Sequence, residues 1–232
     1  LENAIDNNSN LTYSVRSVLN NPKLNGICDA IGNIVSTDET YSNAIDVCLS
    51  SSYNFVVVEN EKSAESAIEY LKSNSLGRVT FFPLNIIEAR SIDYNTLNLI
   101  NNQPGFIDIA SNLVKYDDKY KNIILNQLGN IIVADNMKSA LFISKIINYK
   151  YRIVTLDGEI LHVGGSLTGG SSKKSSSTIL DKMELDKLIL ENSNSDKDIN
   201  RLKSIIESNN KIIDKLNIEI GAVKRKLIYL NE

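Results

Sequence analysis

The sequence predicts a mixed α/β fold, with two duplicated, pseudo-symmetric subdomains followed by a long coiled-coil helix. Three observations lead to this fold class. A block that begins at residue 27 recurs in pattern from residue 106. Within each copy, short β-branched runs alternate with stretches of helical period, as expected for strands and helices in turn. Beyond residue 181 the apolar residues recur at steps of three and four, which is typical of a coiled coil.

The duplication is the strongest of these signals. The offset between the copies is 79 positions, and it then shortens by a few residues, as loop deletions would produce. Val57 and Asn60 align with Val133 and Asn136, and Arg78–Thr80 with Arg152–Val154. The pairs at the offset of 79 are Asp29/Asp108, Asn33/Asn112, Val35/Val114, Asp38/Asp117, Tyr41/Tyr120, Asn43/Asn122 and Leu49/Leu128. Chance does not easily produce such an ordered series, which indicates a duplication.

Each copy is expected to contain the same elements in the same order. In the first copy we expect strands at 31–35, 55–58 and 78–82 and helices at 41–49 and 63–72. In the second copy we expect helices at 120–128 and 138–147 and strands at 131–133 and 152–156. The resulting organisation is an N-terminal coiled-coil stub at 1–12, subdomain 1 at 13–92, a polar connector at 93–104, subdomain 2 at 105–172, a serine-rich linker at 173–180 and an arm helix at 181–232.

The arm helix carries one apolar seam. Its expected positions are Ile199, Leu202, Ile206, Asn209, Ile213, Leu216, Ile220, Val223, Leu227 and Leu230, with Asn209 as the single polar member. A helix of this length, about 75 Å, needs a partner along the whole seam. The stub at 1–12 is too short to supply that partner.

Composition narrows the function classes. Of 232 residues, 42% are hydrophobic, so most of the chain is expected to form cores. The net charge of -3 excludes a general basic field for nucleic acid, so any DNA contact needs a local patch. Two cysteines make no disulfide framework, and no apolar run is long enough to cross a bilayer, so we expect a cytoplasmic setting. The chain lacks an initial Met and ends inside the heptads, so we expect a piece of a longer protein.

A glycine-rich segment, 164–171, is the most informative motif. Gly164, Gly165, Gly169 and Gly170 permit positive φ angles and close backbone approach. The segment nearly fits a phosphate loop, but Gly170 stands where the lysine is required and a serine-rich stretch follows, so nucleotide binding is the alternative that we disfavour most. A flexible exit loop is an alternative. We favour close packing against another backbone.

Other polar groups give no catalytic constellation. His162 is the only histidine, so a two-histidine metal site is excluded. The acidic pairs Asp38-Glu39 and Asp117-Asp118 are expected to cap helices rather than to bind metal or to act as acid and base. Cys28 and Cys48 are expected to be small buried residues. Lys173 and Lys174 are either part of a solvated linker or a DNA phosphate contact.

Together these segments resemble the hinge of structural-maintenance-of-chromosomes (SMC) proteins, most closely the bacterial type. The resemblance covers about 13–172 and rests on residues 24–27, 77–84, 152–159 and 164–170. It implies a ring-shaped homodimer in which each subdomain faces the other subdomain of the partner, with Gly164, Gly165, Gly169 and Gly170 at the interfaces. One departure is Ser50–Ser52, where hinges commonly have glycine; the second copy keeps Gly129.

The resemblance also has implications for the longer protein. It implies ATPase heads that use ATP and Mg at the far ends of the arms, a kleisin-type partner at those heads, and an arm helix that pairs antiparallel with another helix of the same chain. It implies a role in chromosome condensation and segregation, no cofactor for the present segment and no membrane. A stand-alone DNA-binding module and a duplicated α/β enzyme are the alternatives.

Overall fold

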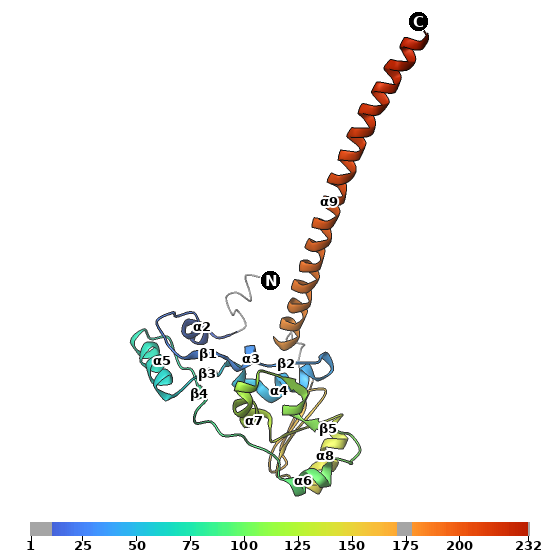
Figure 1. Cartoon of the computed structure of the whole chain (residues 1–232). Helices are drawn as coiled ribbons and strands as arrows, with labels where there is room; N and C mark the ends of the chain where they lie inside the picture. Colours follow the sequence, from blue (N-terminus) through green and yellow to red (C-terminus); the bar gives the residue numbers. More distant parts are fainter. Residues whose placement is uncertain (1–10, 171–177, 232) are drawn as a thin grey trace. The chain divides into compact units, whose positions relative to one another are not determined.

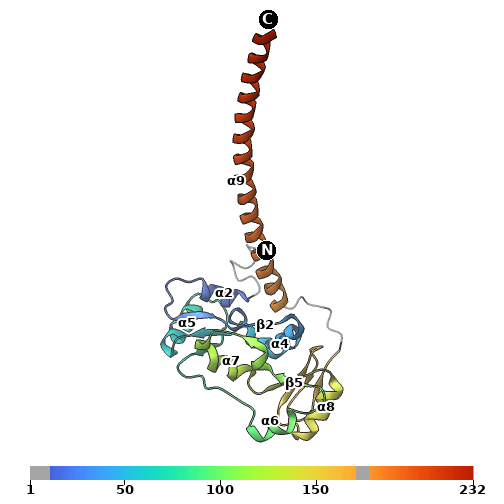
Figure 2. The ribbon, with the colours of Figure 1, turned by 45° about the vertical axis from the view of Figure 1, so that its right-hand side comes forward.

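The computed structural model describes residues 11–170 and 178–231, which divide into a globular unit, 1–183, and a helical unit, 184–232. The globular unit confirms the predicted α/β class, and each of its two halves contains its own sheet and helices (Figure 1, Figure 2). The helical unit belongs to α9 (Thr178–Asn231), which confirms the predicted long helix. No helix among the described residues has the length and apolarity needed to cross a membrane.

Subdomain 1 contains a three-stranded sheet in the order β1-β3-β4. Its elements are α2 (Tyr13–Leu19), β1 (Ile27–Ala30), α3 (Ile31–Ile34), β2 (Ser36–Thr37), η1 (Glu39–Tyr41), α4 (Ser42–Leu49), η2 (Ser50–Asn54), β3 (Val56–Val58), α5 (Glu61–Ser73) and β4 (Phe81–Pro83). The predicted strand at 31–35 is wrong, because the chain turns into α3 after β1. The Asp29 carboxylate accepts from the Ala30 amide and from Asn33 Nδ2, both at 2.7 Å, and so stabilises this helical turn.

Subdomain 2 contains a five-stranded sheet in the order β10-β9-β8-β7-β5. Its elements are α6 (Tyr94–Ile100), β5 (Phe106–Ile109), η3 (Ala110–Leu113), β6 (Val114–Lys115), η4 (Asp118–Tyr120), α7 (Lys121–Leu128), β7 (Ile131–Ala134), α8 (Met137–Ile146), β8 (Arg152–Thr155), β9 (Ile160–Leu161) and β10 (Leu167–Thr168). The segment predicted as a polar connector contains α6, whose Ile100 is fully buried in the core of this subdomain.

The strand registers show the same duplication in three dimensions. In each copy an antiparallel pair with an irregularity is followed by a parallel pair: β1–β3 and β3–β4, then β5–β7 and β7–β8. Val56 pairs with Phe81, and its equivalent Ile132 pairs with Ile153. The structural equivalent of Arg152 is therefore Thr80 and not Arg78, so the last step of the sequence alignment was wrong by two residues. The predicted strand at 78–82 correspondingly begins only at Phe81.

A pseudo-two-fold axis relates the copies at the short pair β2–β6. Ser36 lies opposite Lys115, which is its own equivalent at the offset of 79. An antiparallel ladder centred on two equivalent residues is the arrangement that a local two-fold axis produces. The side chains that pack across this junction come from both copies and form one core. Its largest fully buried members are Ile31, Ile45, Leu49, Ile123, Ile124 and Leu128. Burial of each such side chain stabilises the folded state by about 1.5–3 kcal/mol.

Helix caps recur at equivalent positions. The Asn60 side chain accepts from the Ser63 amide at the start of α5, and the Asn136 side chain accepts from the Ser139 amide at the start of α8, at 3.1 and 3.0 Å. Asparagine at this position satisfies an amide that has no partner within the helix. The identity of Asn60 and Asn136 in the aligned sequence therefore has a local structural cause.

Candidate functional site

The glycine-rich segment forms a β-hairpin between β9 and β10. The Gly165 amide donates to the His162 carbonyl at 3.0 Å, and the His162 amide donates to the Ser166 carbonyl at 2.8 Å. Gly164 and Gly165 have φ angles of 84° and 98°, which glycine adopts without steric cost. Because strand β10 occupies the middle of the motif, the segment has no strand–loop–helix geometry for a phosphate.

The remaining two glycines follow β10. Gly170 has a φ of 132°, whereas Gly169 is outside the left-handed region. Among the described residues, a Cβ added at Gly164 or Gly170 would meet no atom within 4 Å, and one added at Gly169 would lie 3.5 Å from Glu159 Oε1, an ordinary contact. Within the chain itself, three of the four glycines thus have room for a side chain.

Strand β10 is an exposed sheet edge. It is the terminal strand of the five-stranded sheet, and both of its residues are exposed. Leu167 pairs with Leu161 and shares its face of the sheet, yet Leu161 is fully buried while Leu167 is 54% exposed. The apolar face of the sheet therefore extends beyond the part that the chain itself covers. Val163 adds a second exposed apolar side chain, 63% exposed, at the hairpin turn.

Strand β4 ends the sheet of subdomain 1 on the side opposite β1. It is equivalent to β8, and in subdomain 2 the outer edge of β8 is occupied by β9. Subdomain 1 has no corresponding hairpin in the described part of the chain, so β4 ends its sheet. Thr80, immediately before β4, is exposed. The sheet of subdomain 2 therefore ends in the exposed strand β10, whereas the sheet of subdomain 1 has no strand beside β4 among the described residues.

His162 serves the hairpin. Its Nε2 lies 3.0 Å from Thr168 Oγ1, so the residue that follows β9 contacts the last residue of β10. Among the described residues no group of three or more His, Cys, Asp or Glu side chains is arranged to hold a metal. Burial raises the pKa of Cys48 to about 12, and burial followed by the charge of Glu59 raises the pKa of Cys28. Both thiols are therefore poor nucleophiles at neutral pH.

The two acidic pairs differ in their contacts. Asp117 caps η4 as predicted, because its carboxylate accepts from the Lys119 amide at 3.0 Å. Asp38 occupies the equivalent position but makes no capping hydrogen bond. Its carboxylate instead pairs with Lys115 Nζ at 2.8 Å. The capping prediction was therefore right for the second pair and wrong for Asp38.

The serines that replace a common glycine have their own backbone geometry. Ser50 ends α4 with φ 38° and ψ −116°, a region that favours glycine. Gly129, its equivalent in the repeat, has φ −72° and is buried. A Cβ at Gly129 would lie 2.1 Å from the Arg90 carbonyl oxygen. Gly129 is thus required by close packing inside the chain, and the two positions do not share one conformation.

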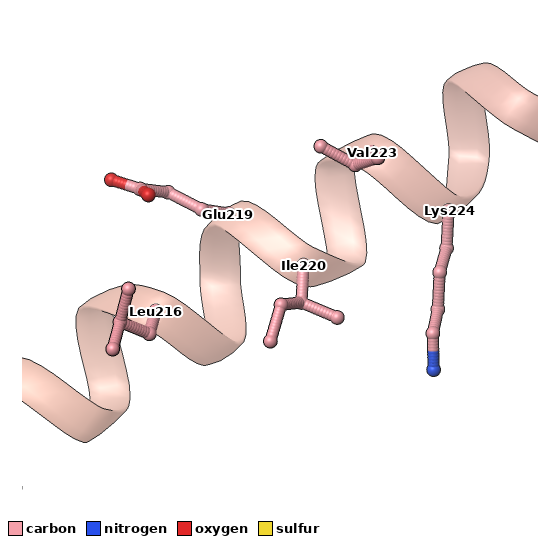
Figure 3. A pocket seen from close by; sticks show the side chains of 5 residues that line it. All are labelled: Leu216, Glu219, Ile220, Val223 and Lys224. Carbon is pink, nitrogen blue, oxygen red and sulfur yellow. The ribbon is translucent and has the colours of Figure 1, made fainter.

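The seam of α9 is apolar and exposed in the single chain. Eight of the ten predicted seam side chains are 47–64% exposed: Ile199, Leu202, Ile206, Ile213, Leu216, Ile220, Val223 and Leu227. Figure 3 shows Leu216, Ile220 and Val223 on neighbouring turns, where they line a shallow groove with Glu219 and Lys224. The side chain of Leu230, like Lys173 and Lys174, lies outside the part that the structure describes.

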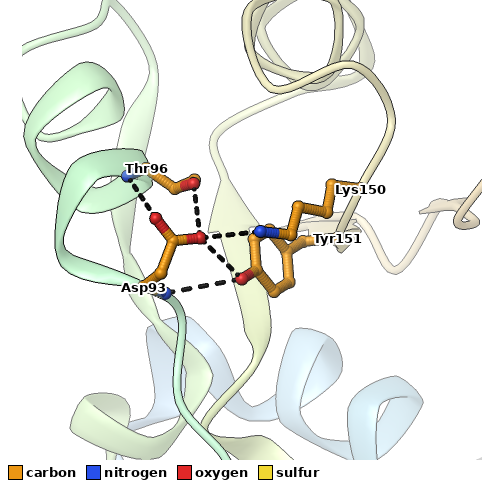
Figure 4. Close-up of polar contacts among 4 residues, drawn as sticks. All are labelled: Asp93, Thr96, Lys150 and Tyr151. Atoms are coloured by element: carbon orange, nitrogen blue, oxygen red, sulfur yellow. Dashed lines mark hydrogen bonds and ion pairs between the residues drawn. The ribbon is translucent and has the colours of Figure 1, made fainter.

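Sequence reasoning missed one polar cluster. Asp93, at the start of α6, contacts Thr96, Lys150 and Tyr151 (Figure 4). Asp93 followed by Thr96 at a spacing of three could have indicated a helix cap. No local signal pairs Asp93 with Lys150, because 57 positions separate them.

Comparison with known proteins agrees with this architecture. The family model described as "SMC proteins Flexible Hinge Domain" matches residues 24–144. The "Chromosome partition protein Smc" of Bacillus subtilis is 39% identical over 158 residues, which are 68% of this chain and 13% of that protein. The protein of the same name from Clostridium kluyveri is 36% identical over 185 residues, 76% of this chain and 15% of that one. The chain thus spans only about a seventh of the length of these curated relatives.

Solved structures give the same answer. The SMC hinge domain of Geobacillus stearothermophilus, crystallised as an asymmetric dimer, has a TM-score of 0.80 at 36% identity and covers 87% of this chain and 82% of its own. The Pyrococcus furiosus Smc hinge domain with an extended coiled coil has a TM-score of 0.59 at 28% identity, over 93% and 74% of the two chains. The repeat, the paired sheets, the glycine hairpin and these matches together establish that the chain belongs to the SMC hinge domain family.

Proposed function

We propose that this chain is a homodimerisation hinge in which edge strand β10 of one chain joins edge strand β4 of the other. The observation that carries the proposal is the complementary pair of edges, exposed β10 in subdomain 2 and open β4 in subdomain 1. An exposed strand edge is a template for pairing with another chain. The Geobacillus stearothermophilus relative, crystallised as a dimer, supports the proposal.

The pairing takes place twice in a symmetric dimer. Strand β10 of one chain lies along β4 of the partner, and the two-fold axis generates the reciprocal contact. Each sheet then continues from subdomain 2 of one chain into subdomain 1 of the other. Leu167, exposed in the single chain, becomes covered at the join. Gly169 and Gly170 allow the backbones to approach closely beside the paired strands.

The role of the longer protein follows from the names of its relatives. Because those relatives are chromosome partition proteins, we propose that the hinge joins two arms of a chromosome-organising, cytoplasmic protein. The seam of α9 would pair with an antiparallel arm helix of the same longer chain. ATP hydrolysis, Mg and a kleisin-type partner would belong to heads at the far ends of the arms.

A crosslinking experiment tests the edge pairing. One batch of chain carries Thr80→Cys, and a second batch, with a different tag, carries Leu167→Cys; both also carry Cys28→Ser. Cys48 stays, because it is 5% exposed and its raised pKa keeps the thiol protonated. After mixing, a short bismaleimide should link the two tags.

The matched control replaces Leu167→Cys with Phe142→Cys, which is exposed to a similar degree on α8. Crosslinks that form equally well with the control, or only between identically tagged chains, would contradict the pairing of β4 with β10. A monomeric mass in light scattering at micromolar concentration would contradict dimerisation itself.

A further inference from the structure

The turn between α8 and β8 has an unusual backbone. Asn148 and Tyr149 have φ angles of 51° and 54°, a left-handed conformation that residues with a side chain rarely adopt. The Tyr149 amide donates to the Ser144 carbonyl at 2.8 Å, and the Lys150 amide donates to the Ile147 carbonyl at 3.2 Å. Two consecutive residues in this conformation persist only where the surroundings hold them.

One side of this turn supports the glycine hairpin. The Gly164 amide donates to the Tyr149 carbonyl at 3.0 Å. A Cβ added at Gly165 would lie 3.3 Å from the Tyr149 ring, so the ring packs directly against the hairpin backbone. The position of Gly164 and Gly165, and through them of β10, therefore depends on the position of Tyr149.

The other side of the turn is held by Asp93. Its Oδ2 accepts from Lys150 Nζ at 2.9 Å and from Tyr151 Oη at 3.0 Å, while its Oδ1 accepts from the Thr96 amide at 3.0 Å (Figure 4). The carboxylate thus caps α6 through Oδ1 and holds the turn through Oδ2, which also accepts from Thr96 Oγ1 at 2.8 Å. Tyr151 immediately precedes β8, the strand on which β9 and the hairpin are built.

We propose that Asp93 is a positioning residue for dimerisation, which through Lys150 and Tyr151 holds the turn that orients the glycine hairpin. The inference rests on the proposed function, because it requires β10 to be a dimer edge. Helix α6, which Asp93 caps, thereby helps to position strand β10.

The variants must separate two roles of Asp93: the contacts of its Oδ2 with Lys150 and Tyr151, called the clamp below, and the cap that its Oδ1 forms on α6. Asp93→Asn keeps a capping side chain and removes the charge that pairs with Lys150. Lys150→Gln and Tyr151→Phe remove the clamp from the opposite side and leave the cap unchanged. Asp38→Asn is the matched control, because it breaks an exposed ion pair of similar length, 2.8 Å, that lies in the β2–β6 region.

The dimer dissociation constant of the full chain is measured by sedimentation over a dilution series. Losing an exposed ion pair should lower the fraction of each chain whose hairpin is correctly placed by roughly 2- to 5-fold. Because both chains of the dimer must be correctly placed, the dissociation constant should rise by the square of that factor, roughly 4- to 25-fold. The double variant of Asp93 and Lys150 should be no weaker than either single variant. Lys150→Arg, which keeps the charge, should retain most of the affinity.

A second readout reports on the hairpin without the dimer. In a Gly169→Val background, Asp93→Asn should speed hydrogen exchange at the Gly164 amide, whereas Asp38→Asn should not. If Gly169→Val splits the dimer but the clamp variants leave the dissociation constant and this exchange rate unchanged, the positioning role is wrong and the edge stands. If Gly169→Val leaves the dimer intact, the edge itself is wrong, and so is the role assigned to Asp93.

Discussion

Replacing Gly169 with valine is the cleanest test of the proposed dimer edge. The glycine follows β10, and its backbone is outside the left-handed region. Among the described residues, the nearest atom to an added Cβ is Glu159 Oε1 at 3.5 Å. The isolated chain therefore accommodates valine with little cost. Gly165 is a poorer test, because its φ of 98° and its approach to the Tyr149 ring would strain the chain itself.

The expected magnitude follows from the symmetry of the dimer. A side chain forced into a closely packed join costs about 1–3 kcal/mol. A two-fold dimer contains two such joins, so the cost is about 2–6 kcal/mol. The dimer dissociation constant should therefore rise by at least roughly 30-fold, since 1.4 kcal/mol corresponds to a factor of ten.

Light scattering and sedimentation over a dilution series measure this change. Far-ultraviolet circular dichroism should be unchanged, because the substitution is outside the core. Gly221→Ala is the control: in α9, the nearest atom to an added Cβ is Arg225 Nη1 at 4.0 Å, so the dimer should not respond. A Gly169→Val chain that is still fully dimeric at nanomolar concentration would refute the assignment of β10 as the edge.

Four further outcomes are expected. Ser50→Gly should stabilise the fold by about 1 kcal/mol and raise Tm by roughly 2–4 °C in a thermal melt, because it removes a side chain from a residue with positive φ; an unchanged or lower Tm would count against that strain. A chain truncated after Ser172 should still dimerise in light scattering, since the proposed edges are in the globular unit; a monomer would assign dimerisation to the coiled coil. Replacing Lys173 and Lys174 with Glu should weaken DNA binding without changing dimerisation, and each lost phosphate contact should reduce the salt slope by about 0.7–0.9 in a titration with labelled DNA; unchanged binding at low salt would remove them from any DNA contact. Hydrogen bonds from Lys150 and then Thr96 lower the pKa of Asp93. The contribution of the Asp93 carboxylate to dimer affinity should therefore be fully present above about pH 4, the ordinary pKa of an aspartate, and should be lost only as the pH falls through the lower pKa of the folded chain. The ratio of the dimer dissociation constants of Asp93→Asn and wild type should be constant from about pH 5 to 9 and should approach one only in stronger acid.

The duplication could be read from the sequence because its signals are local. The carboxylates of Asp29 and Asp108 each accept hydrogen bonds from the next backbone amide and from the side chain of an asparagine four residues later, at 2.7 Å in every case. Such contacts depend only on residues close in the chain, so the same residues recur wherever the same turn recurs. The long helix was equally predictable, since its seam is a periodic pattern.

Short apolar runs were the weak point of the prediction. Residues 31–35 have no period that separates a strand from a helical turn, and the Asp29 contacts decide for the helix. The shared Arg at positions 78 and 152 suggested an alignment that strand pairing contradicts. Register depends on which residues of β3 and β7 face the neighbouring strand, and that is not encoded in a three-residue match.

In the candidate site, too, the local features could be predicted from the sequence and the long-range contacts could not. Sequence by itself marked Gly164, Gly165, Gly169 and Gly170, because glycine clusters are a local signal for unusual backbone. Only the tertiary structure decided that they flank an exposed edge strand, that the sheet of subdomain 1 has an open place beside β4, and that Asp93 reaches Lys150. These are relations between segments far apart in the chain, and they exist only once burial of the shared core has brought the segments together.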